Sequence, residues 1–287
     1  MIAGAQKAGT TSLLRYLGEH PECASHPQKE FAFFLEPSEY AKGYAGAFGK
    51  YFNFSKVDEK SIIIAKSATL YTNEAAIKRL HEHNPDCKLI LILRNPSERA
   101  YSSYLMERNY GSIHYEFNKI IPILQKKKGW EYELFINFGL YEKHLLQIYK
   151  YFPKEQVQVI LFDEVKQDVE KVCKTIFASL NVDTVFVPNL KVKHNVTQQV
   201  RSKTYALAVR KLLQKRSLVR RVISIFVSSH KFYKFGNAIR GLNKTNHPHN
   251  PMDAKTYNTL AEFYAPYNSS LSKLIGKDLS HWNKFKD

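Results

Sequence analysis

The sequence has few cysteines, no long apolar runs and few acidic residues. Its three cysteines, Cys23, Cys87 and Cys173, are odd in number and far apart, so they form neither a disulfide framework nor the paired spacing of a zinc site. No apolar run approaches the roughly 18 residues that a membrane span needs. Because the chain enters its first expected strand at once, we expect no signal peptide. These absences predict a cytoplasmic protein.

The shortage of acidic residues gives the chain a strong positive charge. It has 26 Asp and Glu against 43 Lys and Arg, and its formal net charge is +17. Such a charge attracts a nucleotide, a nucleic acid, an acidic polysaccharide or a lipid surface. The imbalance is greatest in residues 191–245, which hold fourteen Lys and Arg and no Asp or Glu. Apolar residues at roughly helical spacing predict one or two basic amphipathic helices there, packed over the sheet as a lid or cover segment.

Length and composition are typical of one folded α/β domain. The chain has 287 residues, of which 44% are apolar and 13% are aromatic. This is enough for a sizeable core and too apolar for a disordered chain. No internal repeat, low-complexity linker or composition break divides the sequence. We therefore expect residues 1–287 to form a single domain.

Residues 3–17, A-G-A-Q-K-A-G-T-T-S-L-L-R-Y-L, carry the clearest functional pattern. A short apolar start leads into a loop of small residues and then into a helix with one apolar face. Such a loop directs several backbone N–H groups and the positive end of the helix dipole at one point, where an oxyanion is stabilised. Side chains add a charge and hydroxyl donors, from Lys7, Thr10, Thr11 and Ser12. The pattern predicts an anion-binding loop.

The position of the lysine distinguishes this loop from the triphosphate loop of kinases and ATPases. In G-x-x-x-x-G-K-[ST], the lysine directly follows the second glycine. Here Gly4 and Gly9 keep the spacing, but Thr10 stands at the lysine position and Lys7 lies inside the loop. A nucleotide-triphosphate-dependent kinase is therefore disfavoured, and it is kept as an alternative.

Strand patterns alternating with helical patterns predict a parallel sheet with helices on both faces. The strongest strand pattern is K-L-I-L-I-L at residues 88–93, a short apolar run typical of a central parallel strand. Other strands are expected at residues 28–35, 62–65 and 157–162. Helices are expected at residues 10–20, 74–83, 98–108, 139–152, 169–180, 253–264 and 265–274.

Arg94 follows the strongest strand, at the edge of the sheet where ligands of such folds gather. Mg²⁺-dependent phosphate-transfer sites often have an aspartate at this place, so a cation there predicts anion binding without a metal. Arg99, Ser102 and Ser103 add donors at the start of the next helix. These residues predict a second anion site, although a solvated helix start would show the same residue types.

Two motifs together resemble the sulfotransferases that use 3′-phosphoadenosine 5′-phosphosulfate (PAPS). G-A-Q-K-A-G-T-T-S-L-L at 4–14 is similar to the 5′-phosphosulfate loop of that family. L-I-L-R-N-P-S-E-R-A-Y-S-S-Y at 91–104 is similar to its 3′-phosphate motif. The resemblance is to the heparan-sulfate-type and bacterial carbohydrate or small-molecule branch. It implies a P-loop-like three-layer sandwich with a central parallel sheet flanked by helices, and a sulfotransferase domain over residues 1–287.

The resemblance implies PAPS as co-substrate, with adenosine 3′,5′-bisphosphate (PAP) as product and no metal. Lys7 would neutralise the charge that develops on the oxygen bridging sulfur and phosphorus, while Arg94 and Ser102 hold the 3′-phosphate. Arg201 lies in a basic segment similar to the family's nucleotide-covering loop, although the R-K-G form of the cytosolic branch is absent. The donor-binding residues implied are Gln6, Lys7, Ala8, Gly9, Thr10, Thr11, Ser12, Arg94, Ser102 and Arg201.

The resemblance also implies catalytic roles for Glu30 and Lys66, besides Lys7. Glu30 lies in K-E-F, which is similar to the segment that carries the general base of the heparan-sulfate branch. Lys66 has a place similar to a family lysine near the transferred group, although A-K-S-A stands where the family has E-K-T-P. None of the eleven histidines lies in a motif like that of the cytosolic branch. His26 is the histidine nearest to Glu30 in the sequence and is the alternative base.

The sequence does not identify the acceptor. A sugar or small-molecule hydroxyl is expected and an amine is less favoured, with the acceptor wall formed by residues 36–60 and 105–135. No nucleic-acid partner is expected from the resemblance. The basic segment alone would fit nucleic-acid or membrane-surface binding, so peripheral contact with anionic surfaces stays an alternative. The sequence gives no oligomeric state.

Overall fold

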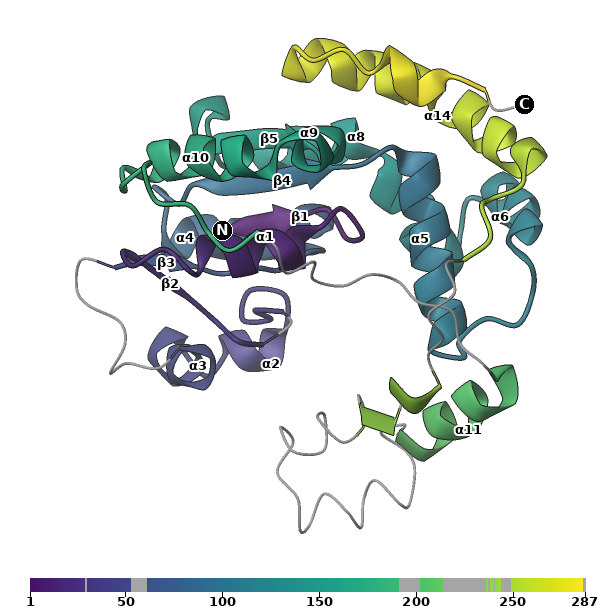
Figure 1. The fold of residues 1–287 in the computed structure, drawn as a ribbon, viewed down its shortest axis with the longest axis horizontal. Coiled ribbons are helices and arrows are strands. Elements are labelled where there is room, and N and C mark those ends of the chain that lie inside the picture. Colours follow the sequence, from purple (N-terminus) through teal and green to yellow (C-terminus); the bar gives the residue numbers. More distant parts are fainter. Residues whose placement is uncertain are drawn as a thin grey trace.

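The computed structural model describes residues 1–28, 30–52, 61–190, 202–213, 236, 238, 239, 241–243 and 249–285. Figure 1 shows a central sheet with helices on both faces, and α5 and α14 beyond one edge of it. Among the described helices, none is both long enough and apolar enough to cross a membrane.

The described strands are short and parallel. They are β1 (Ile2–Gly4), β2 (Cys23–Ser25), β3 (Ile62–Ile64), β4 (Leu89–Leu93) and β5 (Val157–Leu161). β1 pairs with β4, β4 with β5, and β2 with β3. A parallel bridge between Ile2 and Lys66 joins the two sets, because the N–H of Ile2 donates to the carbonyl of Ala65 at 2.8 Å. The order is therefore β2-β3-β1-β4-β5, and all carboxyl ends meet at one edge.

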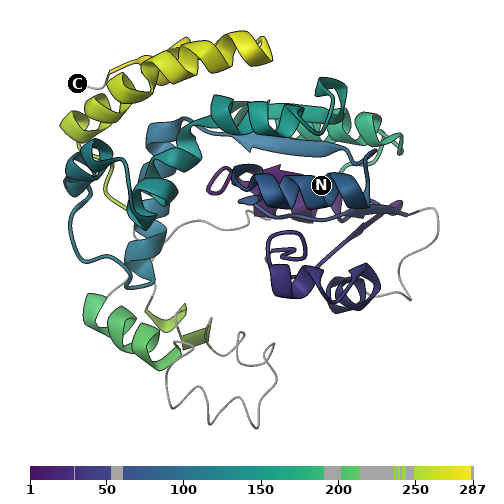
Figure 2. The same cartoon turned by 180° about the vertical axis from the view of Figure 1, so that it is seen from behind.

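Helices cover both faces of the sheet (Figures 1 and 2). α1 (Thr10–Leu17) and α10 (Val169–Leu180) lie on one face, whereas α4 (Glu74–His83) and α8 (Tyr141–Tyr149) lie on the other. Because it is covered on both sides, β4 is buried at all five positions, as its unbroken apolar run predicts. The predicted three-layer fold with a central parallel sheet is confirmed.

A second group of helices lies beyond the carboxyl edge of the sheet. Two residues separate the end of β4 from the start of α5 (Pro96–Asn109), which packs against α7 (Trp130–Phe135) and α14 (Ala254–Ile275). A separate apolar cluster that includes Tyr104 and Tyr264 fills the space between these helices. This cluster fixes the start of α5 beside the ends of β1 and β4.

The remaining described elements are short. The helices are α2 (Pro37–Tyr40), α3 (Tyr44–Tyr51), α6 (Ile120–Lys126), α9 (Phe162–Gln167) and α11 (Lys203–Leu213). The 3₁₀ turns are η2 (Leu70–Thr72), η3 (Phe117–Lys119), η4 (Asn137–Gly139), η5 (Lys154–Gln156) and η6 (Ser280–Asn283). α11 lies in the basic segment where helices were predicted, but most of residues 191–245, including Arg201, falls outside the described residues.

The prediction of a strand at residues 28–35 is wrong. Residues 33–35 form a turn, in which the N–H groups of Leu35 and Glu36 donate to the carbonyl of Ala32. In a strand, successive side chains point to opposite faces, whereas the turn buries Phe31, Phe33 and Phe34 together in the core. Glu30 therefore lies in irregular backbone rather than at a strand start.

The prediction of two helices at residues 253–264 and 265–274 is also wrong. α14 is continuous over Ala254–Ile275 and contains Pro266. Asp253 caps its amino end by accepting a hydrogen bond from the N–H of Thr256. Buried positions on both sides of the proline, including Tyr264 and Leu271, keep the helix on the core. This packing outweighs the backbone hydrogen bond that a proline removes.

Candidate active site

The loop between β1 and α1 has the geometry of an anion cradle. Gly9 and Lys7 have positive φ, at 85° and 71°, which is the left-handed region that turns a chain sharply and that glycine adopts most easily. The N–H of Ala5 donates to the carbonyl of Ile92 at 2.9 Å and ties the loop to β4. α1 then begins at Thr10, and N–H groups of a first helical turn lack partners within the helix.

Arg94 joins the two sequence motifs. It follows β4 directly, and its guanidinium donates to the carbonyl of Lys7 at 3.3 Å and to Glu98 at 3.1 Å. The hydroxyl of Tyr141 donates to the carbonyl of Arg94 at 2.8 Å and holds the backbone there. Asn95 caps α5 by accepting from the N–H groups of two first-turn residues. The predicted 5′ and 3′ motifs therefore meet at one edge of the sheet.

Phe162 is a site residue that the sequence analysis did not single out. It is the first residue of α9, directly after β5. The guanidinium of Arg94 lies 5.1 Å from the centre of its ring, which is within the range of a cation–π interaction. A Cβ added to Gly9 would lie 3.1 Å from the same ring. Its place at the carboxyl end of a predicted strand was the available signal.

Glu30 and Lys66 form an ion pair beside the loop. Lys66 Nζ donates to Glu30 Oε1 at 2.8 Å and to Thr11 Oγ1 at 3.2 Å. Glu30 Oε2 accepts the N–H of Ala68 at 2.9 Å. The side chain of Lys66 is 1% exposed, whereas that of Glu30 is 40% exposed. The carboxylate is therefore held in one orientation and remains open to an incoming molecule.

His26 is a poor candidate for the alternative base. Its ring is 1% exposed, and it packs against Phe31, Tyr51 and Phe52. Its Nε2 accepts the backbone N–H of Lys66 at 3.0 Å. Burial is the main cause that lowers the pKa of His26 to about 4. The imidazole is neutral at physiological pH, and its basic nitrogen is already bonded.

Ser103, rather than its predicted neighbour Ser102, is the α5 residue bonded to the loop. The buried hydroxyl of Ser103 donates to Gln6 Oε1 at 3.1 Å. Ser102, the preceding residue of α5, is half-buried. Ala8 and Thr10 are buried in the loop, and Thr11 and Ser12 are half-buried at the start of α1. The predicted donor-binding residues other than Arg201 thus lie in the loop, in the first turn of α1, directly before α5 and, for Ser102, halfway along α5.

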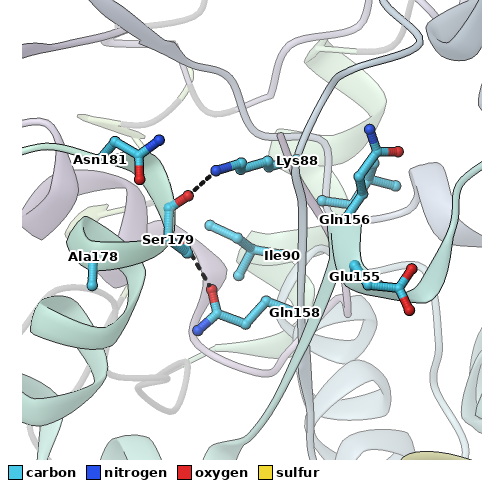
Figure 3. A pocket seen from close by; sticks show the side chains of 9 residues that line it. Lys88, Ile90, Glu155, Gln156, Gln158, Ala178, Ser179 and Asn181 are labelled. Carbon is cyan, nitrogen blue, oxygen red and sulfur yellow. Dashed lines mark hydrogen bonds between the residues drawn. The ribbon is translucent and has the colours of Figure 1, made fainter.

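A hollow of about 310 Å³ lies at the opposite edge of the sheet (Figure 3). It is lined by the first residues of β4 and β5 and by the end of α10, including Lys88, Gln158, Ser179 and Asn181. Figure 3 shows the hydroxyl of Ser179 bonded to the amide of Gln158. None of the predicted site residues that the structure describes lines this hollow; they lie toward the carboxyl edge of the sheet.

The sulfotransferase domain family model matches residues 1–236. The chain belongs to this family. Over 165 residues the sulfotransferase domain is 32% identical to heparan sulfate glucosamine 3-O-sulfotransferase 5 of Mus musculus, covering 56% of this chain and 46% of that protein. Over 301 residues it is 24% identical to the bifunctional heparan sulfate N-deacetylase/N-sulfotransferase of Drosophila melanogaster, covering 96% of this chain and 26% of that protein. The chain thus spans less than half the length of either relative.

A solved structure supports the fold of this sulfotransferase domain. The crystal structure of a sulfotransferase from Alicyclobacillus acidocaldarius matches with a TM-score of 0.67 and 23% sequence identity. The match covers 99% of this chain and 97% of that chain. The family and the fold predicted from the two motifs are therefore confirmed.

Proposed function

We propose that this sulfotransferase-domain protein transfers a sulfuryl group from PAPS to a hydroxyl of a saccharide or small-molecule acceptor. One observation carries the proposal: an anion-binding loop, an arginine and an accessible carboxylate meet at one edge of the sheet. Lys66 connects the Glu30 carboxylate to the Thr11 hydroxyl, which follows the loop, because its Nζ donates a hydrogen bond to each. A site that binds an anionic donor and accepts a proton from an acceptor needs these two features side by side.

The residues present fit the two charged ends of PAPS. The first-turn N–H groups of α1 and the hydroxyls of Thr10, Thr11 and Ser12 would hold the 5′-phosphosulfate. Arg94 and Ser102 would hold the 3′-phosphate. Arg94 already has a carboxylate partner in Glu98, and a phosphate would have to share or replace it. Arg201, which lies outside the described residues, stays a predicted second contact to the 3′-phosphate.

The proposed reaction needs positioning and charge neutralisation rather than a covalent enzyme intermediate. The acceptor oxygen forms a bond to sulfur as the bond between sulfur and the bridging oxygen breaks. Glu30 takes the proton of the acceptor hydroxyl. Lys7, inside the loop, neutralises the negative charge left on the bridging oxygen of PAP.

Lys66 is proposed to act on Glu30 rather than on the acceptor. Its side chain is almost fully buried, and two of its bonds go to Glu30 and Thr11. It therefore fixes the carboxylate relative to the loop that would hold the sulfuryl group. This assigns Lys66 a positioning role within the catalytic group that the resemblance implied.

The saccharide class of acceptor is supported by the relatives, whose names specify heparan sulfate. They include both O- and N-sulfotransferases. A carboxylate base could take the proton of a hydroxyl or of an ammonium group, so the preference for a hydroxyl stays a prediction from the sequence. The absence of a metal requirement, the absence of a nucleic-acid partner and the cytoplasmic location stay predictions from the sequence.

The substitution Glu30→Gln tests the proposed base, because it keeps the shape of the side chain and removes its basicity. We expect kcat with PAPS to fall by about 10²–10⁴, while PAP affinity stays within a few-fold. Acceptors would first be screened with labelled PAPS, and PAP affinity would be measured by calorimetry.

Glu74→Gln is the matched control for Glu30→Gln. The side chain of Glu74 is also 40% exposed, and it forms an ion pair with Lys150 at 3.0 Å. The pair lies between the start of α4 and the end of α8. We expect this variant to keep its activity. A Glu30→Gln enzyme with wild-type kcat would rule out Glu30 as the base, and the geometry of His26 gives no support for moving the role there.

A further inference from the structure

Arg99 is a buried cation whose hydrogen bonds within the described residues go to neutral groups. Its side chain is 0% exposed, and it donates to Ser103 Oγ at 3.1 Å and to the carbonyls of Leu134 and Phe135 at 2.9 Å and 2.6 Å. Within the described residues, none of its partners is a carboxylate. Burying a charge is costly unless it is well bonded. The two carbonyls compensate part of this cost, because they lie at the negative end of α7.

Ser103 carries the contact from Arg99 to the loop. It lies four residues after Arg99 on α5, on the same face of the helix. Its hydroxyl has a single proton. Since it accepts a bond from Arg99, that proton is donated to Gln6 Oε1, at 3.1 Å. Ser103 is fully buried, so water does not compete, and each donor in the row polarises the next.

This bond decides which way the Gln6 amide faces. With Oε1 committed to Ser103, the NH₂ group is the part of the amide left for another partner. Among the described residues, none accepts a hydrogen bond from that NH₂ group. Gln6 directly precedes Lys7 in the anion-binding loop. An amide turned the other way would present its oxygen to an anion and repel it.

We propose that Arg99 and Ser103 are a positioning pair that holds the Gln6 amide with its NH₂ group toward the 5′ end of the bound donor. The inference rests on the proposed function, because the anion concerned is the 5′-phosphosulfate of PAPS. The row of bonds also ties the loop to α5, the helix that begins beside Arg94. It therefore fixes the spacing between the two ends of the donor site.

A double-mutant cycle on the full chain tests the contact between Ser103 and Gln6, with calorimetric binding of PAP and of adenosine 3′-monophosphate. We expect Ser103→Ala to weaken PAP binding about tenfold, the loss of one charge-assisted hydrogen bond. Adenosine 3′-monophosphate lacks the 5′ group, so its affinity should not change. The double variant of Gln6→Ala and Ser103→Ala should bind PAP no more weakly than Gln6→Ala alone, because the two residues act in series.

Gln6→Glu is a second test that leaves Arg99 and Ser103 bonded. One carboxylate oxygen accepts from Ser103, and the other places a negative charge where the NH₂ group stood. We expect PAP affinity to fall at least about 100-fold. Wild-type PAP affinity in this variant would overturn the proposed orientation of the amide.

Ser179→Ala is the matched control, since Ser179 Oγ donates to Gln158 Oε1 at 3.3 Å at the opposite edge of the sheet (Figure 3). It should leave both affinities unchanged. Equal losses for the two nucleotides in Ser103→Ala, or additive losses in the double variant, would show that Ser103 only supports α5. Wild-type protein that binds no PAP would overturn the proposed function as well, so the two failures are distinguishable.

Discussion

At the scale of single residues, Lys7 brings a full positive charge into the loop. A backbone N–H group of the loop supplies only part of a charge, whereas the bridging oxygen of the proposed reaction gains a whole negative charge. We expect Lys7→Ala to lower kcat by on the order of 10²-fold or more, as when one pre-organised donor is removed. Turnover of labelled PAPS checks this.

Lys88→Ala is the control for the loss of charge in Lys7→Ala, because Lys88 is exposed at the other edge of the sheet. It should keep wild-type kcat. A Lys7→Ala enzyme that turns over as fast as Lys88→Ala would show that the loop does not hold the reacting group.

His26 makes stability depend on pH. Burial lowers its pKa from 6.5 to about 4 in the folded protein, so the unfolded chain binds more protons between these values. The sign follows: the contribution of the neutral ring is complete above pH 6.5 and is lost as pH falls toward 4. Between pH 6.5 and pH 4 and below, this difference in pKa changes the free energy of unfolding by on the order of 3 kcal/mol in total.

We therefore expect the free energy of unfolding, measured with urea, to fall more steeply between pH 6.5 and pH 4 in the wild type than in His26→Gln. Glutamine keeps an acceptor near the position of Nε2, which bonds the N–H of Lys66, and it does not titrate. Comparing slopes cancels the carboxylates that titrate in both proteins. Parallel slopes would contradict the assignment of a neutral, buried His26.

At the scale of elements, the junction of β4 and α5 brings Arg94 to the proposed donor site. We expect Arg94→Ala to weaken PAP binding about tenfold or more, because a charge-assisted bond to phosphate contributes roughly 1.5 to 3 kcal/mol. Binding of adenosine 5′-phosphosulfate, which has no 3′-phosphate, should change much less. Calorimetry with both nucleotides measures the ratio.

Arg108→Ala is the matched control, and Arg108 lies on α5, the helix that follows Arg94. Its side chain is 22% exposed and pairs with Glu116, against 24% for Arg94 paired with Glu98. It should bind both nucleotides like the wild type. If Arg94→Ala lost affinity equally for both nucleotides, Arg94 would support the loop through Lys7 rather than read the 3′-phosphate.

Elements with a strong local pattern were predicted well from the sequence. β4 and α10 follow an apolar run and a helical repeat, and the structure places them within a residue of the expected bounds. Residues 28–35 were not predicted well. A turn buries their aromatic side chains against residues that are distant in the sequence, and no local sequence period indicates such contacts. α14 was divided at Pro266 because its tertiary packing is not visible in the sequence.

The same distinction applies to the candidate site. The loop and Arg94 lie in continuous motifs, so the sequence indicated them directly. The contact of Lys66 with both Glu30 and Thr11 depends on the order of strands β2, β3 and β1. The contact of Arg94 with Phe162 and the bond from Ser103 to Gln6 likewise join residues that are far apart in the chain. Such contacts follow from sheet topology, whereas the roles of these residues stay predictions.

At the scale of the whole molecule, the net charge of +17 and the clustering of donors at one sheet edge favour the same ligand. An anionic nucleotide neutralises part of the charge that otherwise opposes the compact state. The donor should therefore stabilise the folded protein in two ways, by its contacts in the loop and by reducing repulsion. Added salt screens both effects at the surface.

We expect PAP to raise the melting temperature, and ATP with Mg²⁺ to raise it much less. A ligand present at 100 times its dissociation constant adds about 2.7 kcal/mol to the free energy of unfolding, which corresponds to a shift of roughly 5 °C for a domain of this size. ATP has no 3′-phosphate for Arg94 and Ser102 to bind, and the loop has Thr10 where a triphosphate loop has its lysine. Equal shifts for the two nucleotides would favour a triphosphate site. The Arg94→Ala variant separates the two cases. If Arg94 binds the 3′-phosphate, this variant loses the melting-temperature shift with PAP and keeps the smaller shift with ATP.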